Sequence, residues 1–252
     1  ADVASGKSEL VDRDPWAPFP PPRVAWSGDS GWIAYPKGAG PLTTAIWLYD
    51  VRKAATRQVT SGRFADGWPV FDRKGELLYF TSARKFEAPT YEDVGTTFVY
   101  AETGLLYAVP LRTDVASPLL PKSDEEGAGD DEEKDGDKAE EEEKSGKEDD
   151  GKGDKKEGKP EAPPKPVAID LDGFEARAVE LPVDRAVFAD LAVEADGKLL
   201  FTRRPRSGSE DKGSIEIFDT YNTRAPGIAL SCEDYGLVYR LTERNQGPRL
   251  RL

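Results

Sequence analysis

The fold is decided by the stretch Trp26-Ser27-Gly28-Asp29-Ser30-Gly31-Trp32-Ile33-Ala34-Tyr35, in which a polar turn separates two apolar segments. A second copy reads Pro69-Val70-Phe71-Asp72-Arg73-Lys74-Gly75-Glu76-Leu77-Leu78-Tyr79-Phe80, so that the turn glycines Gly31 and Gly75 stand 44 positions apart. Two weaker copies follow at 191–201 and 228–239, with Gly197 and Gly236 separated by 39 positions. A period of ~40–45 residues is typical of one β-propeller blade.

Each copy predicts a β-hairpin, because glycine accepts the positive φ that tight turns require. After the first hairpin, residues 45–51 and 56–60 predict two further strands. Together they give one four-stranded antiparallel blade from Arg23 to Gly62. The side chains at 32–35 and 46–49 are nearly all large and apolar, which indicates strands buried on both faces between neighbouring blades.

The second blade begins at Trp68, has its third strand at 105–111 and is completed by 167–182, beyond an acidic insertion. Residues 84–100 form a loop too long for a simple hairpin, and long loops on rigid scaffolds often carry function. The third blade covers 188–220. We expect its fourth strand to be shortened or lost, because 221–226 leaves little room before the next hairpin begins at Gly227.

The predicted fold class is therefore all-β, an incomplete β-propeller of about three to four four-stranded antiparallel blades with a disordered acidic insertion. Residues 1–22 are expected to form a Pro-rich connector and the end of a preceding blade, and residues 23–121 the first blade and the first part of the second. The disordered acidic insertion covers 122–166. Residues 167–240 are expected to hold the end of blade two, blade three and the start of blade four, followed by a tail at 241–252. Terminal blades of such an arc expose apolar faces, with Trp32 and Trp47 expected on one side and 237–239 on the other.

The acidic insertion explains the polar composition of the chain. Residues 122–160 hold 18 Asp or Glu and 9 Lys, with no aromatic residue and no aliphatic residue larger than alanine. Such a segment buries too little apolar surface to offset the entropy of ordering it. Its net charge of −9, taken from the total of −13, leaves −4 for the remainder. Neither part has the basic patches that nucleic acid requires, so no nucleic-acid partner is predicted.

The chain contains no histidine, no methionine and one cysteine, Cys232. A Ser-His-Asp or Cys-His arrangement and a histidine-ligated zinc site therefore have no base or ligand within these residues. We predict no catalytic, cofactor-binding or metal-binding residues and no cofactor.

Four tryptophans, Trp26, Trp32, Trp47 and Trp68, are interpreted as inter-blade core, with ligand stacking as the alternative. The aspartates of the repeated turns, Asp29, Asp72 and Asp196, are interpreted as turn formers because a carboxylate there accepts hydrogen bonds from neighbouring backbone N–H groups.

No apolar run approaches the ~18–20 residues of a membrane span, and no signal-peptide pattern stands at the start, so no membrane partner is predicted. The chain opens at Ala1 in mid-pattern, and we expect it to be an internal piece of something longer or a chain whose start has been removed.

These residues resemble the propeller region of the bacterial tricorn protease family. The resemblance rests on 26–35, Ile46-Trp47-Leu48-Tyr49-Asp50, the strand at 105–111 with Ser117-Pro118, and especially Ile169-Asp170-Leu171-Asp172-Gly173 following a charged insertion. It extends over about 8–240, with Gly28 at a position where the family usually has proline.

The resemblance implies a non-catalytic propeller segment that channels or filters peptide substrates toward the catalytic domain of a serine peptidase. Its implied partners are peptide substrates, the PDZ and catalytic domains of the same peptidase, and further copies in a homo-oligomer. The expected compartment is the cytoplasm, with the periplasm left open. The alternative is a free-standing TolB-like propeller that acts as a protein–protein interaction module.

Overall fold

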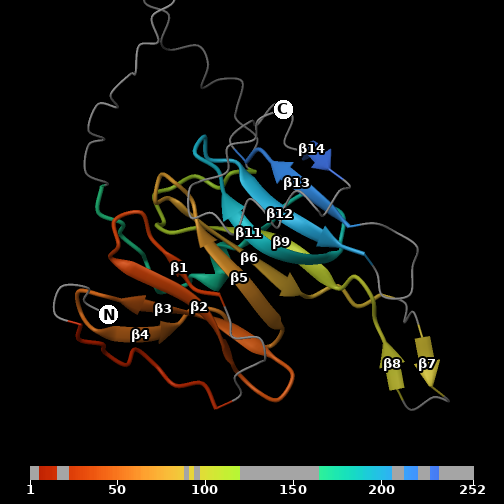
Figure 1. Cartoon of the computed structure of the whole chain (residues 1–252), viewed down its shortest axis with the longest axis horizontal. Helices are drawn as coiled ribbons and strands as arrows, with labels where there is room; N and C mark the ends of the chain where they lie inside the picture. The colour runs from red at the N-terminus through yellow and green to blue at the C-terminus, as the bar shows by residue number, and fades with distance from the viewer. Residues whose placement is uncertain are drawn as a thin grey trace, which may run out of the picture. The chain divides into compact units, whose positions relative to one another are not determined.

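The computed structural model describes residues 6–15, 23–87, 91–93, 97–119, 165–205, 213–220 and 228–232. The chain divides into two units, Ala1–Leu120 with Pro164–Leu252, and Pro121–Pro163. All described residues belong to the first unit, and nearly all of its regular structure is β-strand (Figure 1).

Blade 1 consists of four antiparallel strands, as the sequence predicts. They are β1 (Ala25–Trp26), β2 (Trp32–Gly38), β3 (Thr44–Asp50) and β4 (Ala55–Gln58), paired in chain order. Meandering connections of this kind are expected where short polar turns join consecutive strands.

Blade 2 is divided by the acidic insertion. Its strands are β5 (Ala65–Phe71), β6 (Leu77–Ala83), β9 (Gly104–Pro110) and β10 (Val179–Glu180). The last strand pairs antiparallel with β9, with Val179 opposite Ala108, although the insertion separates the two in sequence. The chain thus returns to the edge of β9 after the insertion. One parallel bridge, Thr44 to Ala65, links blades 1 and 2.

The long connection between β6 and β9 contains two short strands that the sequence analysis did not predict. They are β7 (Tyr91–Asp93) and β8 (Thr97–Val99), which pair with each other. At the base of this hairpin the rings of Phe86 and Tyr100 pack edge to face, with their centres 5.4 Å apart.

Blade 3 corrects the expectation of a lost fourth strand. It comprises β11 (Val187–Val193), β12 (Leu199–Arg204), β13 (Ser214–Phe218) and β14 (Ile228–Cys232), all paired in chain order. The segment assigned to a fourth blade is therefore the outer strand of the third. Without β14, the outer edge of β13 would leave its backbone N–H and C=O groups unpaired. Pairing with β14 gives these groups their hydrogen-bond partners. Gly236 and the second strand of the hairpin predicted there, 237–239, lie outside the described residues.

The hydrophobic core lies between blades, as expected for strands buried on both faces. Leu78 and Phe80 belong to a cluster with the blade 1 residues Ala34, Ile46 and Leu48. Their neighbours along β6, Leu77 and Tyr79, belong instead to a cluster with Phe188, Leu199 and Phe201 of blade 3. Because side chains alternate along a strand, blade 2 buries one set on each side.

Only one of the four tryptophans predicted as inter-blade core is buried there. Trp32 is 7% exposed and packs between blades 1 and 2. Trp47 and Trp68 are partly exposed, and Trp26 is 55% exposed. The expectation that Trp32 lies on the open side of the arc is also wrong. Trp26 pairs with Ile33, one position beyond Trp32, so Trp26 and Trp32 point to opposite faces of blade 1.

The turn aspartates act as predicted. Asp72 accepts hydrogen bonds from the N–H groups of Glu76 and Leu77, at 2.8 and 3.0 Å, and Asp196 accepts one from Lys198 at 3.4 Å. Asp29 accepts one from Gly31 at 3.0 Å.

The turn glycines play two different roles. Gly75 and Gly197 have the positive φ that was expected, 70° and 93°. In the first turn Ser30 adopts it, at 57°. Gly31 is required for another reason, because an added Cβ would stand 2.8 Å from a carboxylate oxygen of Asp29.

Candidate functional site at the innermost strands

One position repeats in the three blades, just before the first strand of blade 1 and within the first strands of blades 2 and 3. The cross-strand pairs Trp26 with Ile33, Phe71 with Leu78, and Val193 with Leu199 define equivalent positions in the three hairpins. Three positions before Trp26, Phe71 and Val193 stand Arg23, Trp68 and Asp190. In a propeller these first strands line the central channel.

Two of these residues are held in unusual backbone conformations. Trp68 and Asp190 have φ values of 51° and 52°, which residues with a side chain rarely adopt. Each lies where the strand register shifts, between Gly67 and Val70 in β5 and between Ala189 and Ala192 in β11. Such bulges redirect a side chain and often lie near functional sites.

Arg23 contacts both of the other equivalent residues. The guanidinium carbon of Arg23 lies 5.6 Å from the centre of the Trp68 ring, and its Nη2 lies 3.7 Å from Oδ1 of Asp190. Arg204 Nη2 is 3.7 Å from Oδ2 of the same carboxylate, and the Thr202 hydroxyl donates to it at 3.1 Å. We call Arg23, Trp68, Asp190 and Arg204 the inner cluster.

The inner cluster is open to solvent. The side chains of Arg23 and Arg204 are 66% and 52% exposed. Ion pairs this exposed are worth ~0–1 kcal/mol, so both guanidinium groups can exchange Asp190 for another carboxylate at little cost. Two cations against one anion, beside an indole face, form a site suited to a carboxylate or to a backbone carbonyl.

A second arrangement ties the chain beyond the insertion to both preceding blades. We call residues 167–177 the strap. Toward blade 1, Val167 N–H donates to Asp29 Oδ2 at 3.0 Å and its carbonyl accepts from Trp32 Nε1 at 3.0 Å. Toward blade 2, Asp170 N–H donates to the Leu111 carbonyl at 2.8 Å.

Partial burial works against the charge of Asp29, but hydrogen bonds from Ser27, Val167, Gly31 and Arg52 outweigh it and lower the pKa of Asp29 to about 2. This carboxylate is therefore ionised at neutral pH and serves as a fixed acceptor for the strap.

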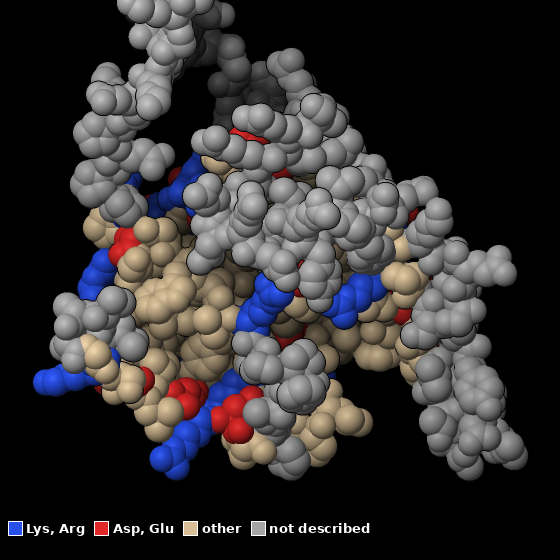
Figure 2. Space-filling model, viewed as in Figure 1, with Lys and Arg blue, Asp and Glu red and all other residues tan. Residues whose placement is uncertain are grey.

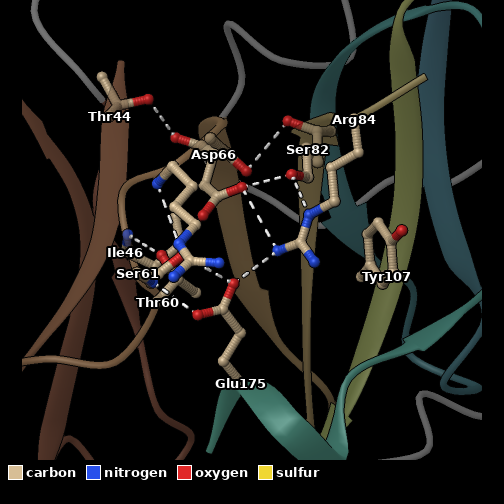
Figure 3. Close-up of polar contacts among 12 residues, drawn as sticks. Thr44, Ile46, Thr60, Ser61, Asp66, Ser82, Arg84, Tyr107 and Glu175 are labelled. Atoms are coloured by element: carbon tan, nitrogen blue, oxygen red, sulfur yellow. Dashed lines mark hydrogen bonds and ion pairs between the residues drawn. The ribbon is translucent and has the colours of Figure 1, made fainter. Parts of the chain in front are cut away.

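A partly buried polar cluster lies where the strap meets the seam between blades 1 and 2 (Figure 3). Glu175, in the short 3-10 helix η2 (Glu175–Arg177), accepts hydrogen bonds from Ser61 N–H at 2.7 Å and from Arg84 Nη2 at 3.0 Å. Arg84 also donates from Nε to the Ser82 hydroxyl at 2.7 Å, and Ser82 in turn donates to Asp66.

Asp66 is 1% exposed. Burial raises the pKa of Asp66, and hydrogen bonds from Ser82 and Thr60 together with the positive charge of Arg84 oppose that rise. A ligand in solvent cannot reach this carboxylate, and Ser82 has no imidazole base beside it. The hydrogen bonds of this cluster tie blades 1 and 2 to the strap.

The remaining functional candidates from the sequence are placed as follows. Within the described ranges, no three His, Cys, Asp or Glu residues gather closely enough to hold a metal ion. No helix among the described residues is long and apolar enough to cross a membrane. On the face in Figure 2, basic and acidic side chains are interspersed. In the loop 84–100, Glu87 pairs with Arg185 at 2.8 Å.

The sequence analysis missed the inner cluster. The sequence repeat nevertheless contained the information, because Arg23, Trp68 and Asp190 fall at the same position when the three hairpins are aligned.

One protein family and several known proteins are similar to this chain. The family described as tricorn protease second beta propeller domain matches residues 1–237. Tricorn protease homolog 2 of Streptomyces coelicolor is 29% identical over 204 residues, which span 74% of this chain and 14% of that protein. The crystal structure of the tricorn protease is similar with a TM-score of 0.59 and 20% identity, over 91% of this chain and 20% of that one. TolB from Acinetobacter baumannii has a TM-score of 0.41 and 14% identity, over 81% of this chain and 31% of that one. The chain thus spans a fifth or less of the tricorn proteins it matches.

Proposed function

The chain belongs to the family of the tricorn protease second β-propeller domain, and from this premise we propose that it is a non-catalytic segment that guides peptides toward the catalytic domain of a serine-type peptidase. The absence of histidine from the sequence supports a non-catalytic role, since a serine without a base is a weak nucleophile.

The inner cluster is the observation that carries this proposal. Arg23, Trp68 and Asp190 occupy one repeated position at the first strands of three successive blades, and Arg23 contacts both Trp68 and Asp190. An extended peptide offers carbonyl groups along its length and a carboxylate at its end. Guanidinium groups bind such oxygens by charge-assisted hydrogen bonds, and an indole face packs against side chains of any sequence. Contacts of this kind favour passage of many peptides over selection of one.

The proposed partners are peptide substrates and the PDZ and catalytic domains of the same peptidase, within a homo-oligomer in the cytoplasm. The family assignment supports the proposal of partner domains in the same peptidase.

The experiment measures both halves of the proposal on the purified chain. Fluorogenic peptides should be hydrolysed no faster than in buffer. Labelled unstructured peptides with a free carboxyl end should bind, and Arg23→Gln should weaken their affinity roughly three- to tenfold in fluorescence anisotropy, as expected for one charge-assisted hydrogen bond.

Lys53→Gln is the matched control, because this lysine is 78% exposed in the turn between β3 and β4 and lies outside the inner cluster. Equal affinities of Arg23→Gln and the unaltered chain would refute the peptide-guiding role. Hydrolysis that a serine-directed inhibitor abolishes would refute the non-catalytic role.

A further inference from the structure

The inner cluster supplies the charge on the channel side of the three described blades. Within the first strands β1, β5 and β11, the only ionisable residue outside the cluster is Asp66, which is 1% exposed. The side chains of Arg23, Asp190 and Arg204 are 66%, 28% and 52% exposed. A peptide in the channel therefore meets two positive charges and one negative charge at this level, which together are net positive.

Asp190 lies between the two cations without engaging either of them closely. Arg23 Nη2 is 3.7 Å from Oδ1, and Arg204 Nη2 is 3.7 Å from Oδ2. An N–H···O hydrogen bond needs a distance of ~2.7–3.2 Å, so both contacts are electrostatic attractions without a direct hydrogen bond. Asp190 thus holds both guanidinium groups nearby and does not use their N–H donors.

The bulge in β11 fixes the carboxylate of Asp190 in this place. The residue has a φ of 52°, and the register shifts between Ala189 and Ala192. The hydroxyl of Thr202 bonds to both sides of this bulge, since it donates to the Ala189 carbonyl at 3.0 Å and to Asp190 Oδ2 at 3.1 Å. Asp190 is therefore a built-in competitor for any carboxylate that approaches the two arginines.

Charge decides which groups of a peptide this arrangement favours. A backbone carbonyl and a carboxylate can both accept from guanidinium N–H groups, but hydrogen bonds between ionised partners are roughly twice as strong as neutral ones. A peptide ammonium group is repelled by Arg23 and Arg204. The Trp68 ring does not offset that repulsion by a cation–π contact, because Arg23 already lies over it at 5.6 Å.

We propose that the inner cluster sorts peptides by charge, so that segments with Asp or Glu side chains bind more tightly than neutral segments, and segments with Lys or Arg bind less tightly. The inference rests on the peptide-guiding role proposed above and names the class of peptide that this role favours. Arg23 and Arg204 determine the specificity. Asp190 limits it by competing for both of them.

The test compares three unstructured peptides with acetylated and amidated ends that differ only in one central residue, Glu, Gln or Lys. Fluorescence anisotropy measures their affinities for the 252-residue chain. In low salt we expect the affinity to fall about threefold from Glu to Gln and about threefold again from Gln to Lys, as exposed charge pairs allow. In about 1 M salt, where the Debye length is ~3 Å, the three affinities should converge.

Substitutions in the cluster assign the preference to its charges. Asp190→Asn should raise the preference for Glu over Gln to about tenfold, because the competing carboxylate is removed. Arg204→Gln should abolish most of the preference, since the charges of Arg23 and Asp190 then cancel, and Arg204→Lys should retain most of it. Lys53→Gln is the matched control, because it removes the same charge at an exposed turn outside the cluster and should leave the preference unchanged.

The outcomes separate this inference from the proposed function. If none of the three peptides binds, the peptide-guiding role fails and charge sorting fails with it. If all three bind equally in low salt while Arg23→Gln weakens each of them alike, the guiding role stands and charge sorting is overturned. A preference for Glu that is unchanged in Arg204→Gln and Asp190→Asn would place its source outside the inner cluster, which would also overturn the inference.

Discussion

Asp29, in the first hairpin turn of blade 1, accepts a hydrogen bond from the backbone N–H of Val167, which follows 138 positions later in the sequence. The same carboxylate accepts from the Ser27 hydroxyl at 2.6 Å and from Arg52 at 2.8 Å. One turn residue therefore both shapes its own hairpin and fixes the chain that returns from the acidic insertion.

Asp29→Ala should destabilise the protein by roughly 2–3 kcal/mol, because it leaves several donors without an acceptor. Urea unfolding followed by tryptophan fluorescence measures the loss. Asp196→Ala is the control, since this equivalent turn residue is 52% exposed and pairs with Lys198 of the same turn, through a long hydrogen bond from the N–H at 3.4 Å and an ion pair with Nζ at 2.9 Å. It should cost less than ~1 kcal/mol. Similar losses at the two positions would contradict a special role for Asp29.

Asp29 should also make stability depend on acid pH. Its folded pKa of about 2 lies below the ordinary value of 3.8, so the carboxylate contributes stability that is fully present above pH ~4 and is lost as the pH falls toward 2. The contribution is roughly 2 kcal/mol. In urea titrations at several pH values, the gap between the unaltered chain and Asp29→Asn should close over this range. A gap that stays constant from pH 6 to pH 2 would rule out this linkage.

Gly75→Ala should be strongly destabilising. Gly75 has φ of 70°, and a Cβ there would stand 2.7 Å from Cγ2 of Val167 in the strap. Strain from positive φ alone costs ~1 kcal/mol or more, and displacement of Val167 adds to it. Gly28→Ala is the matched control, because an added Cβ at Gly28 meets no atom within 4 Å. Thermal melts of the two variants should differ by at least several degrees, and equal melting temperatures would contradict the contact between Gly75 and the strap.

Arg84→Ala should cost ~3 kcal/mol or more, because it removes the cation between Asp66 and Glu175 and leaves a buried carboxylate without compensation. Adding Asp66→Asn should recover part of the loss. Arg112→Ala provides the control, since its partner Asp114 is 72% exposed. A double variant no more stable than Arg84→Ala would show that the charge of Asp66 is not what Arg84 compensates.

Replacing residues 122–160 by a Gly/Ser linker of about 12 residues should leave the melting temperature nearly unchanged, because this segment has almost no apolar side chains to bury. The strap and β10 remain in place in this variant. Differential scanning calorimetry measures the outcome. A fall of about ten degrees or more would mean that the segment packs on the blades.

The blades could be predicted from sequence because their turns repeat, and each turn combines residues whose backbone chemistry is local. The exposure of Trp26 could not, since it depends on which face of β1 meets another blade, and a one-residue difference in register reverses that face. Ile228–Cys232 was assigned to the wrong blade for a similar reason, because its apolar pattern suits either an outer strand or a first strand. The strap depends on hydrogen bonds between residues more than a hundred positions apart, which no local pattern reveals.

The inner cluster could be predicted from the sequence in part. The positions of Arg23, Trp68 and Asp190 follow from the repeat, but their contact follows from bulges at Trp68 and Asp190. Neither bulge has a glycine at the residue with positive φ, so the usual sequence sign of such a conformation is missing.

The division of blade 2 also sets an order on its assembly during synthesis. Thr113 leaves the ribosome 57 residues before its partner Asp170. At ~5–20 residues per second, the ribosome needs roughly 3–11 s to translate that interval. Throughout this delay β9 has no β10 to pair with, and the core between blades 1 and 2 lacks the side chains of Val167 and Phe174. The nascent chain must therefore pass several seconds with an unprotected strand edge, followed in sequence by the most strongly charged and least aggregation-prone segment of the protein.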